Sequence, residues 1–197
     1  MKVTVIGTGY VGLVVGTCLA DLGNDVICMD VDEKKIKMLN KGKIPIFEPG
    51  LQDLFDRNTE EGRLTFTTDI KKAVRESEII FIAVGTPEGK DHKADLSFVK
   101  QVAADIGKYM NSYKVVVNKS TVPVGTAEIV KRIIKENQKT PIEFDVVSNP
   151  EFLREGEAIN DFTFPERIVI GVESERAEDI MDKLYRGITR TGRPLLV

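Results

Sequence analysis

KVTVIGTGYVG, residues 2–12, joins a short apolar run to three glycines at G-x-G-x-x-G spacing, and a stretch with helical periodicity follows. This pattern is typical of a strand that passes into the amino end of a helix around a pyrophosphate. Gly7 permits the tight turn, Gly9 lets the backbone approach the phosphates, and Gly12 allows the helix to pack close to the strand. The unpaired N–H groups and positive dipole end of that helix would face the negative ligand.

A carboxylate at the end of the next strand supplies the second half of this fingerprint. Residues 25–30, DVICMD, are expected to form a strand ending at Asp30, which lies 18 residues after Gly12, near the spacing of about 20 typical of a ribose-binding acid. A carboxylate there accepts hydrogen bonds from the ribose 2′-OH and repels a 2′-phosphate, which favours NAD over NADP. The alternative is a solvated aspartate at a strand end.

Composition limits the classes of protein that this chain can represent. Among 197 residues, 42% are hydrophobic and 30% are charged, with a net charge of −3 and no basic run, which argues against nucleic-acid binding. No apolar stretch approaches the ~20 residues of a membrane span, and we expect a cytoplasmic protein. Cys18, Cys28 and the single histidine, His92, match no metal or redox motif. We therefore expect no metal site and two buried structural cysteines.

Apolar runs rich in β-branched residues alternate with amphipathic stretches along the whole chain. The expected strands are 2–6, 25–29, 63–67, 78–84, 114–118, 143–148, 167–172 and 194–197. The expected helices are 10–23, 32–41, 50–61, 69–76, 96–110, 125–137 and 174–188. This alternation predicts an α/β fold with a doubly wound, mostly parallel Rossmann-type sheet and helices on both faces. No linker interrupts it, so we expect a single domain over 1–197.

Three segments of unusual composition follow expected strands, where open α/β sheets usually handle ligands. In Gly85-Thr86-Pro87, Thr86 could line the nicotinamide half of the site, although an ordinary turn is an alternative. In residues 119–125, KSTVPVG, the hydroxyls could contact a ligand or cap the following helix. In residues 148–156, SNPEFLREG, Glu151 and Glu155 would share one face of a helical turn and could do acid–base work. The alternative for this last segment is a solvated, charged loop.

Together these segments resemble the amino-terminal domain of the nucleotide-sugar 6-dehydrogenases, the UDP-glucose/GDP-mannose dehydrogenase family. The resemblance covers essentially the whole chain. Its motifs are GTGYVG at 7–12, DVD at 30–32, IFEPGL at 46–51, VGTP at 84–87, ADLSFV at 94–99, KSTVPVG at 119–125, NPEFLREG at 149–156 and PERIVIG at 165–171. The last two look most like the UDP-glucose branch, while GDP-mannose and UDP-N-acetylhexosamine members remain alternatives.

The resemblance implies oxidation of a sugar C6 alcohol to a carboxylate in two steps, with two NAD consumed and a thioester formed on a cysteine. It implies a catalytic role for Glu151 as the base of thioester hydrolysis, for Thr121 in positioning the water, and for Glu155 near nicotinamide and sugar. The implied NAD contacts are Gly7, Gly9, Tyr10, Val11, Gly12, Asp30, Lys35, Thr86, Thr121 and Glu155. The implied substrate contacts are Glu151, Phe152, Leu153 and Glu155.

The family's nucleophilic cysteine and its catalytic lysine and asparagine have no counterpart in this sequence, because Cys18 and Cys28 match neither the motif nor its location. We therefore expect a fragment that is inactive alone, possessing the cofactor half of the site. The family dimerises largely through a central helix that follows this region, so the longer enzyme is expected to be a homodimer and this piece a monomer. A non-catalytic NAD-binding module is the alternative from another class.

Overall fold

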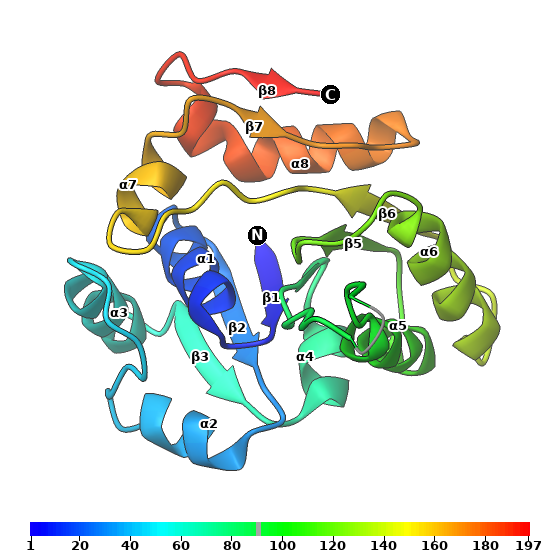
Figure 1. Cartoon of the computed structure of the whole chain (residues 1–197), viewed down its shortest axis with the longest axis horizontal. Helices are drawn as coiled ribbons and strands as arrows, with labels where there is room; N and C mark the ends of the chain where they lie inside the picture. Colours follow the sequence, from blue (N-terminus) through cyan, green and yellow to red (C-terminus); the bar gives the residue numbers. More distant parts are fainter. Residues whose placement is uncertain (90–91) are drawn as a thin grey trace.

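A six-stranded sheet, all of whose pairings are parallel, organises the fold (Figure 1) in the order β3-β2-β1-β4-β5-β6. The computed structural model describes residues 1–89 and 92–197. The strands are β1 (Lys2–Ile6), β2 (Asp25–Met29), β3 (Leu64–Thr67), β4 (Ile79–Ile82), β5 (Lys114–Asn118) and β6 (Phe144–Ser148). The order reverses between β1 and β4, so a crevice is expected at their carboxyl ends. The predicted doubly wound Rossmann-type fold is confirmed.

Helices cover both faces of this sheet (Figure 1). They are α1 (Tyr10–Asp21), α2 (Glu33–Leu39), α3 (Leu51–Glu60), α4 (Ile70–Glu76), α5 (Ser97–Tyr109), α6 (Thr126–Asn137), α7 (Ala158–Thr163) and α8 (Glu175–Thr189). Alternate residues of a strand point to opposite faces. In β4, Ile79 and Phe81 pack in a cluster with α1, α3, α7 and α8, while Ile80 and Ile82 pack with α4, α5 and α6. The strands are therefore buried on both sides, as their continuous apolar sequences indicated.

The last two expected strands lie outside the main sheet. β7 (Ile168–Val169) and β8 (Leu195–Leu196) form a separate two-stranded parallel sheet. Gly171, which follows β7, forms an isolated antiparallel bridge with Ser148 at the end of the edge strand β6. Both expected stretches therefore contain strands, but these strands are shorter than predicted and pair with each other.

The two long connections differ from expectation in one respect. Residues 149–166 contain the short helix α7, which was not predicted because six residues are too few to reveal a helical period. In the connection 84–95, residues 90–91 lie outside the described part of the chain. That residues 1–197 form a single domain stays a prediction. Val3 of β1 and Ile188 of α8 belong to one core cluster. Among the described residues, no helix has the length and apolar character needed to cross a bilayer.

Candidate functional site

The glycine loop between β1 and α1 has the geometry that its sequence predicts. Gly7 has a φ of +102°, and a Cβ there would lie 2.6 Å from the Ala83 carbonyl oxygen. A Cβ on Gly12 would lie 1.9 Å from the Gly7 carbonyl oxygen, so the close approach is to the loop itself rather than to the strand. Gly9 is exposed, and a Cβ there would meet nothing within 4 Å. The space above Gly9 is thus open to a ligand.

Within the described residues, the amino end of α1 has no side-chain cap, as is also the case for α3, α5, α6 and α7. Asp32, Asp69 and Ser174 cap α2, α4 and α8 with their side chains. In the described part of the chain no side chain caps α1, which begins after Gly9, and its first turn holds no acid. The first N–H groups of a helix have no partner within the helix. This helix end is therefore available for an anion such as a pyrophosphate.

Asp30 is fixed beside this loop at the carboxyl end of β2. Its Oδ2 accepts hydrogen bonds from the Thr8 N–H at 2.8 Å, the Thr8 hydroxyl at 2.7 Å and the Lys35 ammonium at 3.0 Å. Its Oδ1 accepts the Asp32 N–H at 3.0 Å. Burial disfavours the charged carboxylate, but these hydrogen bonds outweigh it and lower the pKa of Asp30. The structure brings Asp30 and Lys35 together as an ion pair facing the glycine loop.

The loops that follow β4 and β5 are joined to each other. The Thr86 hydroxyl donates to the Thr121 carbonyl oxygen at 2.8 Å, and the Ser120 hydroxyl donates to the Val84 carbonyl oxygen at 2.7 Å. Neither Ser120 nor Thr121 caps α6, whose preceding residue, Gly125, is left-handed and offers no side chain. Helix capping, the alternative for these hydroxyls, is therefore wrong. Thr121 is exposed, which keeps its hydroxyl accessible to a ligand.

The acidic segment after β6 is not helical before Ala158, so the expected pairing of Glu151 and Glu155 on one helix face was wrong. The Glu151 carboxylate accepts a hydrogen bond from the N–H of Leu153, two residues later, at 2.7 Å, while Glu155 is exposed. Leu153 packs against the core, whereas Phe152 is 54% exposed. The segment thus folds back through Leu153 and leaves both carboxylates at the surface of the site.

Thr121 and Glu151, predicted from separate motifs, line one cavity of about 430 Å³ together with Lys119. Lys119 is a site residue that sequence analysis missed. It is only 6% exposed, and its ammonium lies 3.2 Å from the Asn149 side-chain oxygen and 3.4 Å from the Pro150 carbonyl oxygen. Burial lowers the pKa of Lys119 to about 8, against the opposing effect of the Glu151 charge. The signal was present as a single cation between an apolar strand and a Ser-Thr pair.

Glu48, in the IFEPGL motif, is a second residue whose role the sequence did not indicate. Its side chain is buried, and it binds the Tyr10 hydroxyl and the N–H groups of Gly156 and Ala158. Burial, the hydrogen bond to Glu48 and the nearby Glu155 charge raise the pKa of Tyr10 to about 12. Tyr10 therefore stays a neutral donor.

Neither cysteine is placed for chemistry at this edge of the sheet. Cys18 in α1 and Cys28 in β2 are free and buried, and burial raises the pKa of each thiol to about 12. Both are structural, as expected. No group of three or more histidine, cysteine, aspartate or glutamate residues in the described part of the chain could hold a metal ion.

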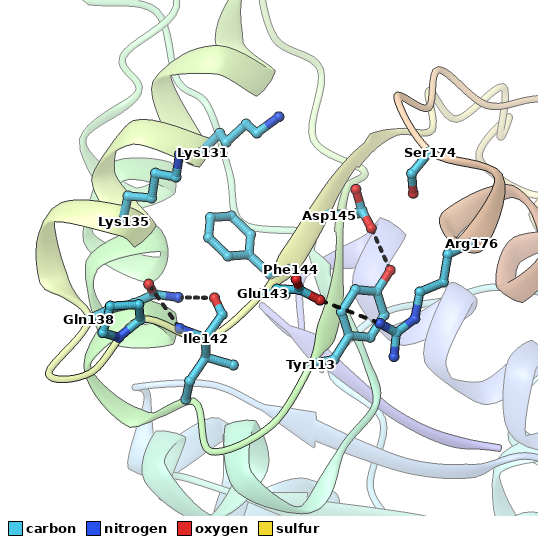
Figure 2. Close-up of a pocket in the computed structure, with 11 residues that line it drawn as sticks. Tyr113, Lys131, Lys135, Gln138, Ile142, Glu143, Phe144, Asp145, Ser174 and Arg176 are labelled. Carbon is cyan, nitrogen blue, oxygen red and sulfur yellow. Dashed lines mark hydrogen bonds and ion pairs between the residues drawn. The ribbon is translucent and has the colours of Figure 1, made fainter.

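A separate cavity of about 540 Å³ lies at the opposite edge, by the amino ends of β5 and β6 (Figure 2). Most of its charged groups are paired with each other or with neighbours. The Tyr113 hydroxyl donates to Asp145, the Arg176 guanidinium lies 3.4 Å from the Tyr113 ring centroid, and Lys131 pairs with Glu173. Most charges of this cavity are therefore already paired, and the cavity is remote from the carboxyl ends of the strands.

A family model described as the NAD binding domain of the UDP-glucose/GDP-mannose dehydrogenase family matches residues 1–189. The chain belongs to this family. Its membership confirms the resemblance drawn from the motifs and the expectation of NAD as the cofactor.

Individual members of the family match throughout the chain. The UDP-glucose 6-dehydrogenase TuaD of Bacillus subtilis is 57% identical over 94% of this chain and 40% of its own length. A UDP-glucose dehydrogenase from Pyrobaculum islandicum superposes with a TM-score of 0.95 at 40% identity, over 100% of this chain and 45% of that one. A GDP-mannose dehydrogenase from Pseudomonas aeruginosa gives a TM-score of 0.93 at 39% identity, over 100% and 46%. The chain thus spans less than half the length of these relatives.

Proposed function

We propose that this chain provides the NAD half of an enzyme that oxidises the C6 alcohol of a nucleotide sugar. One observation carries the proposal: the glycine loop, Asp30, the Thr86–Thr121 pair and the acidic segment all lie at the carboxyl ends of adjacent parallel strands. In doubly wound sheets this edge is where dinucleotides bind.

The described side chains suit NAD along its length. The amino end of α1 would receive the pyrophosphate, with Gly7, Gly9, Tyr10, Val11 and Gly12 as its lining. Asp30 would accept hydrogen bonds from the adenosine ribose, because Oδ1 carries only the Asp32 N–H while Oδ2 is occupied by Thr8 and Lys35. Lys35 would lie beside that ribose through its pairing with Asp30. A 2′-phosphate there would meet an ionised carboxylate, which supports NAD over NADP.

The far end of the edge would receive the nicotinamide and the sugar. When bound, NAD accepts a hydride from the substrate carbon. Thr86 and Thr121 would line the nicotinamide side, and Glu155 would lie between it and the sugar. Glu151 would act as a base toward water held with the help of Thr121, since both residues line the same cavity. Phe152 and Leu153 would contact the substrate together with the two acids.

UDP-glucose is the substrate that we propose first, because the TuaD enzyme is 57% identical to this chain. Structural likeness alone does not separate the sugars, since the UDP-glucose and GDP-mannose enzymes superpose almost equally well. We further propose that the longer enzyme is a cytoplasmic homodimer. The free, buried thiols of Cys18 and Cys28 suit a reducing compartment.

The test is a calorimetric titration of these 197 residues with NADH and, in parallel, with NADPH. Saturable binding of NADH with much weaker binding of NADPH would support the assignment of the cofactor site. Binding of neither would contradict it for this chain. We expect no turnover of UDP-glucose by this chain alone, and NADH production free of contaminating enzyme would refute the proposal that it is only half of the site.

A further inference from the structure

One buried carboxylate joins two parts of the proposed site that are far apart in sequence. Glu48 lies between α2 and α3 and is 6% exposed. Its Oε2 accepts the Tyr10 hydroxyl and the Gly156 N–H, the latter at 2.8 Å. Its Oε1 accepts the Ala158 N–H at 2.8 Å and lies 3.5 Å from the Ile159 N–H. Tyr10 begins α1, while the three backbone donors lie at the end of the acidic segment and the start of α7.

The arrangement is closed, because the Gly156 N–H also lies 3.1 Å from the Tyr10 hydroxyl oxygen. Tyr10, Glu48 and Gly156 therefore contact one another in a ring of three. A buried carboxylate is costly unless hydrogen bonds compensate for the lost water. Burial works against ionisation of Glu48, but the hydrogen bonds from Tyr10 and the backbone outweigh it and lower its pKa. Displacing any one member would leave a buried charge under-compensated.

The ring also fixes the position of a predicted site residue. Gly156 has a φ of +87°, a left-handed conformation that few other residues adopt. Glu155 immediately precedes it, and its charge acts on the Tyr10 hydroxyl. The backbone that carries Glu155 is therefore held against the first turn of α1, the same turn that would meet the pyrophosphate.

We propose that Glu48 is a positioning residue that links the cofactor loop to the acidic segment, so that binding of the dinucleotide at α1 orders Glu155. The proposal rests on the proposed function. It predicts that the cofactor stabilises backbone amides in residues 154–158, which belong to the segment that would hold the sugar rather than the pyrophosphate.

Amide hydrogen exchange, measured with and without saturating NADH, tests this link. In the unaltered chain we expect NADH to slow exchange at the Gly156 and Ala158 amides about fivefold, the equivalent of one hydrogen bond of ~1 kcal/mol. Tyr10→Phe removes only the hydroxyl of a residue that lines the proposed cofactor site, so calorimetry first fixes the NADH concentration that saturates this variant. At that concentration NADH should still slow exchange in α1. The slowing at Gly156 and Ala158 should be lost. Glu48→Gln replaces one acceptor oxygen by an NH2 group, which cannot accept a hydrogen bond from the backbone N–H groups, and it should show the same loss.

Asp161→Asn is the matched control. Asp161 accepts hydrogen bonds from the backbone and guanidinium of Arg154 within the same segment, and the described residues include no hydrogen bond or ion pair from Asp161 to α1. This variant should exchange faster in the absence of cofactor and still show the NADH-dependent slowing. A purely structural role for Glu48 would accelerate exchange equally with and without NADH, and would leave the ratio unchanged.

The outcomes separate this proposal from the function on which it rests. Failure of the unaltered chain to bind NADH would overturn both. Binding that slows exchange in α1 but not at Gly156 would overturn the link alone, and so would a Tyr10→Phe variant that keeps the slowing at Gly156. If Glu48→Gln does not fold, Tyr10→Phe decides, because it leaves the backbone hydrogen bonds of Glu48 in place.

Discussion

Replacing Asp30 by alanine should reverse much of the preference between the two nicotinamide cofactors. Asp30 is ionised, held at the end of β2, and has one oxygen, Oδ1, that carries a single hydrogen bond from the Asp32 N–H. A ribose diol would donate to this oxygen. The alanine variant loses that acceptor for NADH, whereas for NADPH it removes a negative charge that opposes the 2′-phosphate.

The size of the effect follows from the charge on the acceptor. A hydrogen bond to a charged group contributes about 1.5–3 kcal/mol, so loss of one should weaken NADH binding by roughly tenfold to 150-fold. Removal of the negative charge by itself should leave NADPH binding unchanged or strengthen it. The variant also loses the contacts of Asp30 with Thr8 and Lys35, which would loosen the glycine loop and weaken both cofactors alike. The ratio of the two dissociation constants isolates the contribution of the ribose.

Calorimetric titration of the unaltered chain and of Asp30→Ala with each cofactor measures that ratio. Asp32→Ala is the control, because this neighbouring carboxylate caps α2 by accepting from the Lys34 and Lys35 N–H groups. Its loss should cost about 1 kcal/mol of stability and leave the ratio of affinities unchanged. Equal losses of NADH and NADPH affinity in Asp30→Ala would refute the assignment of Asp30 to the ribose.

Three further predictions concern the glycine loop and the buried charges. Gly12→Ala places a Cβ 1.9 Å from the Gly7 carbonyl oxygen and should lower the free energy of unfolding, measured in urea, by about 3 kcal/mol or more. Gly9→Ala should change the free energy of unfolding by less than about 1 kcal/mol. It should nevertheless weaken NADH binding, measured by calorimetry, about tenfold. Because the fold lowers the pKa of Glu48, the ionised carboxylate stabilises the folded state above the unfolded pKa of about 4.3, and this stabilisation is lost as the pH falls. Between about pH 5 and pH 3 the unaltered chain should therefore lose stability more steeply than Glu48→Gln. Because the fold lowers the pKa of Lys119 to about 8, the unfolded chain binds more protons at this residue above that pH, so Lys119 should add about 1–2 kcal/mol of stability from about pH 7.5 to 9.5. The buried thiols of Cys18 and Cys28, whose pKa the fold raises, act in the opposite direction, so the measurement is the stability of the unaltered chain minus that of Lys119→Met, which should rise over this range.

The part of the site that local spacing alone predicted, the glycine loop and Asp30, lies within one strand–helix–strand unit. Gly7 precedes α1, Gly12 lies in its first turn, and Asp30 follows the next strand, so their spacing alone places them at one edge of the sheet. The fold class was predictable for a similar reason, because most strands of the main sheet are apolar runs. Residues 167–172 were predicted as a strand, but pairing with residues 194–197 rather than with β6 depends on tertiary packing that no local pattern reports.

The acidic segment shows how a distant residue overrides a local pattern. Spacing of four residues favours a helix that would place Glu151 and Glu155 on one face. Instead, the Glu151 carboxylate takes the Leu153 N–H, and the Glu48 carboxylate takes the N–H groups of Gly156 and Ala158. The helix therefore begins at Ala158, where a side chain more than one hundred positions earlier satisfies its first donor.

Long-range contacts of this kind explain why the cofactor end was easier to predict than the sugar end. The ribose acid depends on one crossover connection, whereas the hydrogen bond between Thr86 and Thr121 spans 35 positions and that between Tyr10 and Gly156 spans 146. Such pairs are determined by the order of strands in the sheet, which brings the ends of β1, β4, β5 and β6 to one edge. If Glu48 links α1 to the acidic segment as we propose, a substitution of Glu48, between α2 and α3, should alter the effect of the cofactor on amide exchange in the acidic segment. It should do so without changing any residue proposed to contact the sugar.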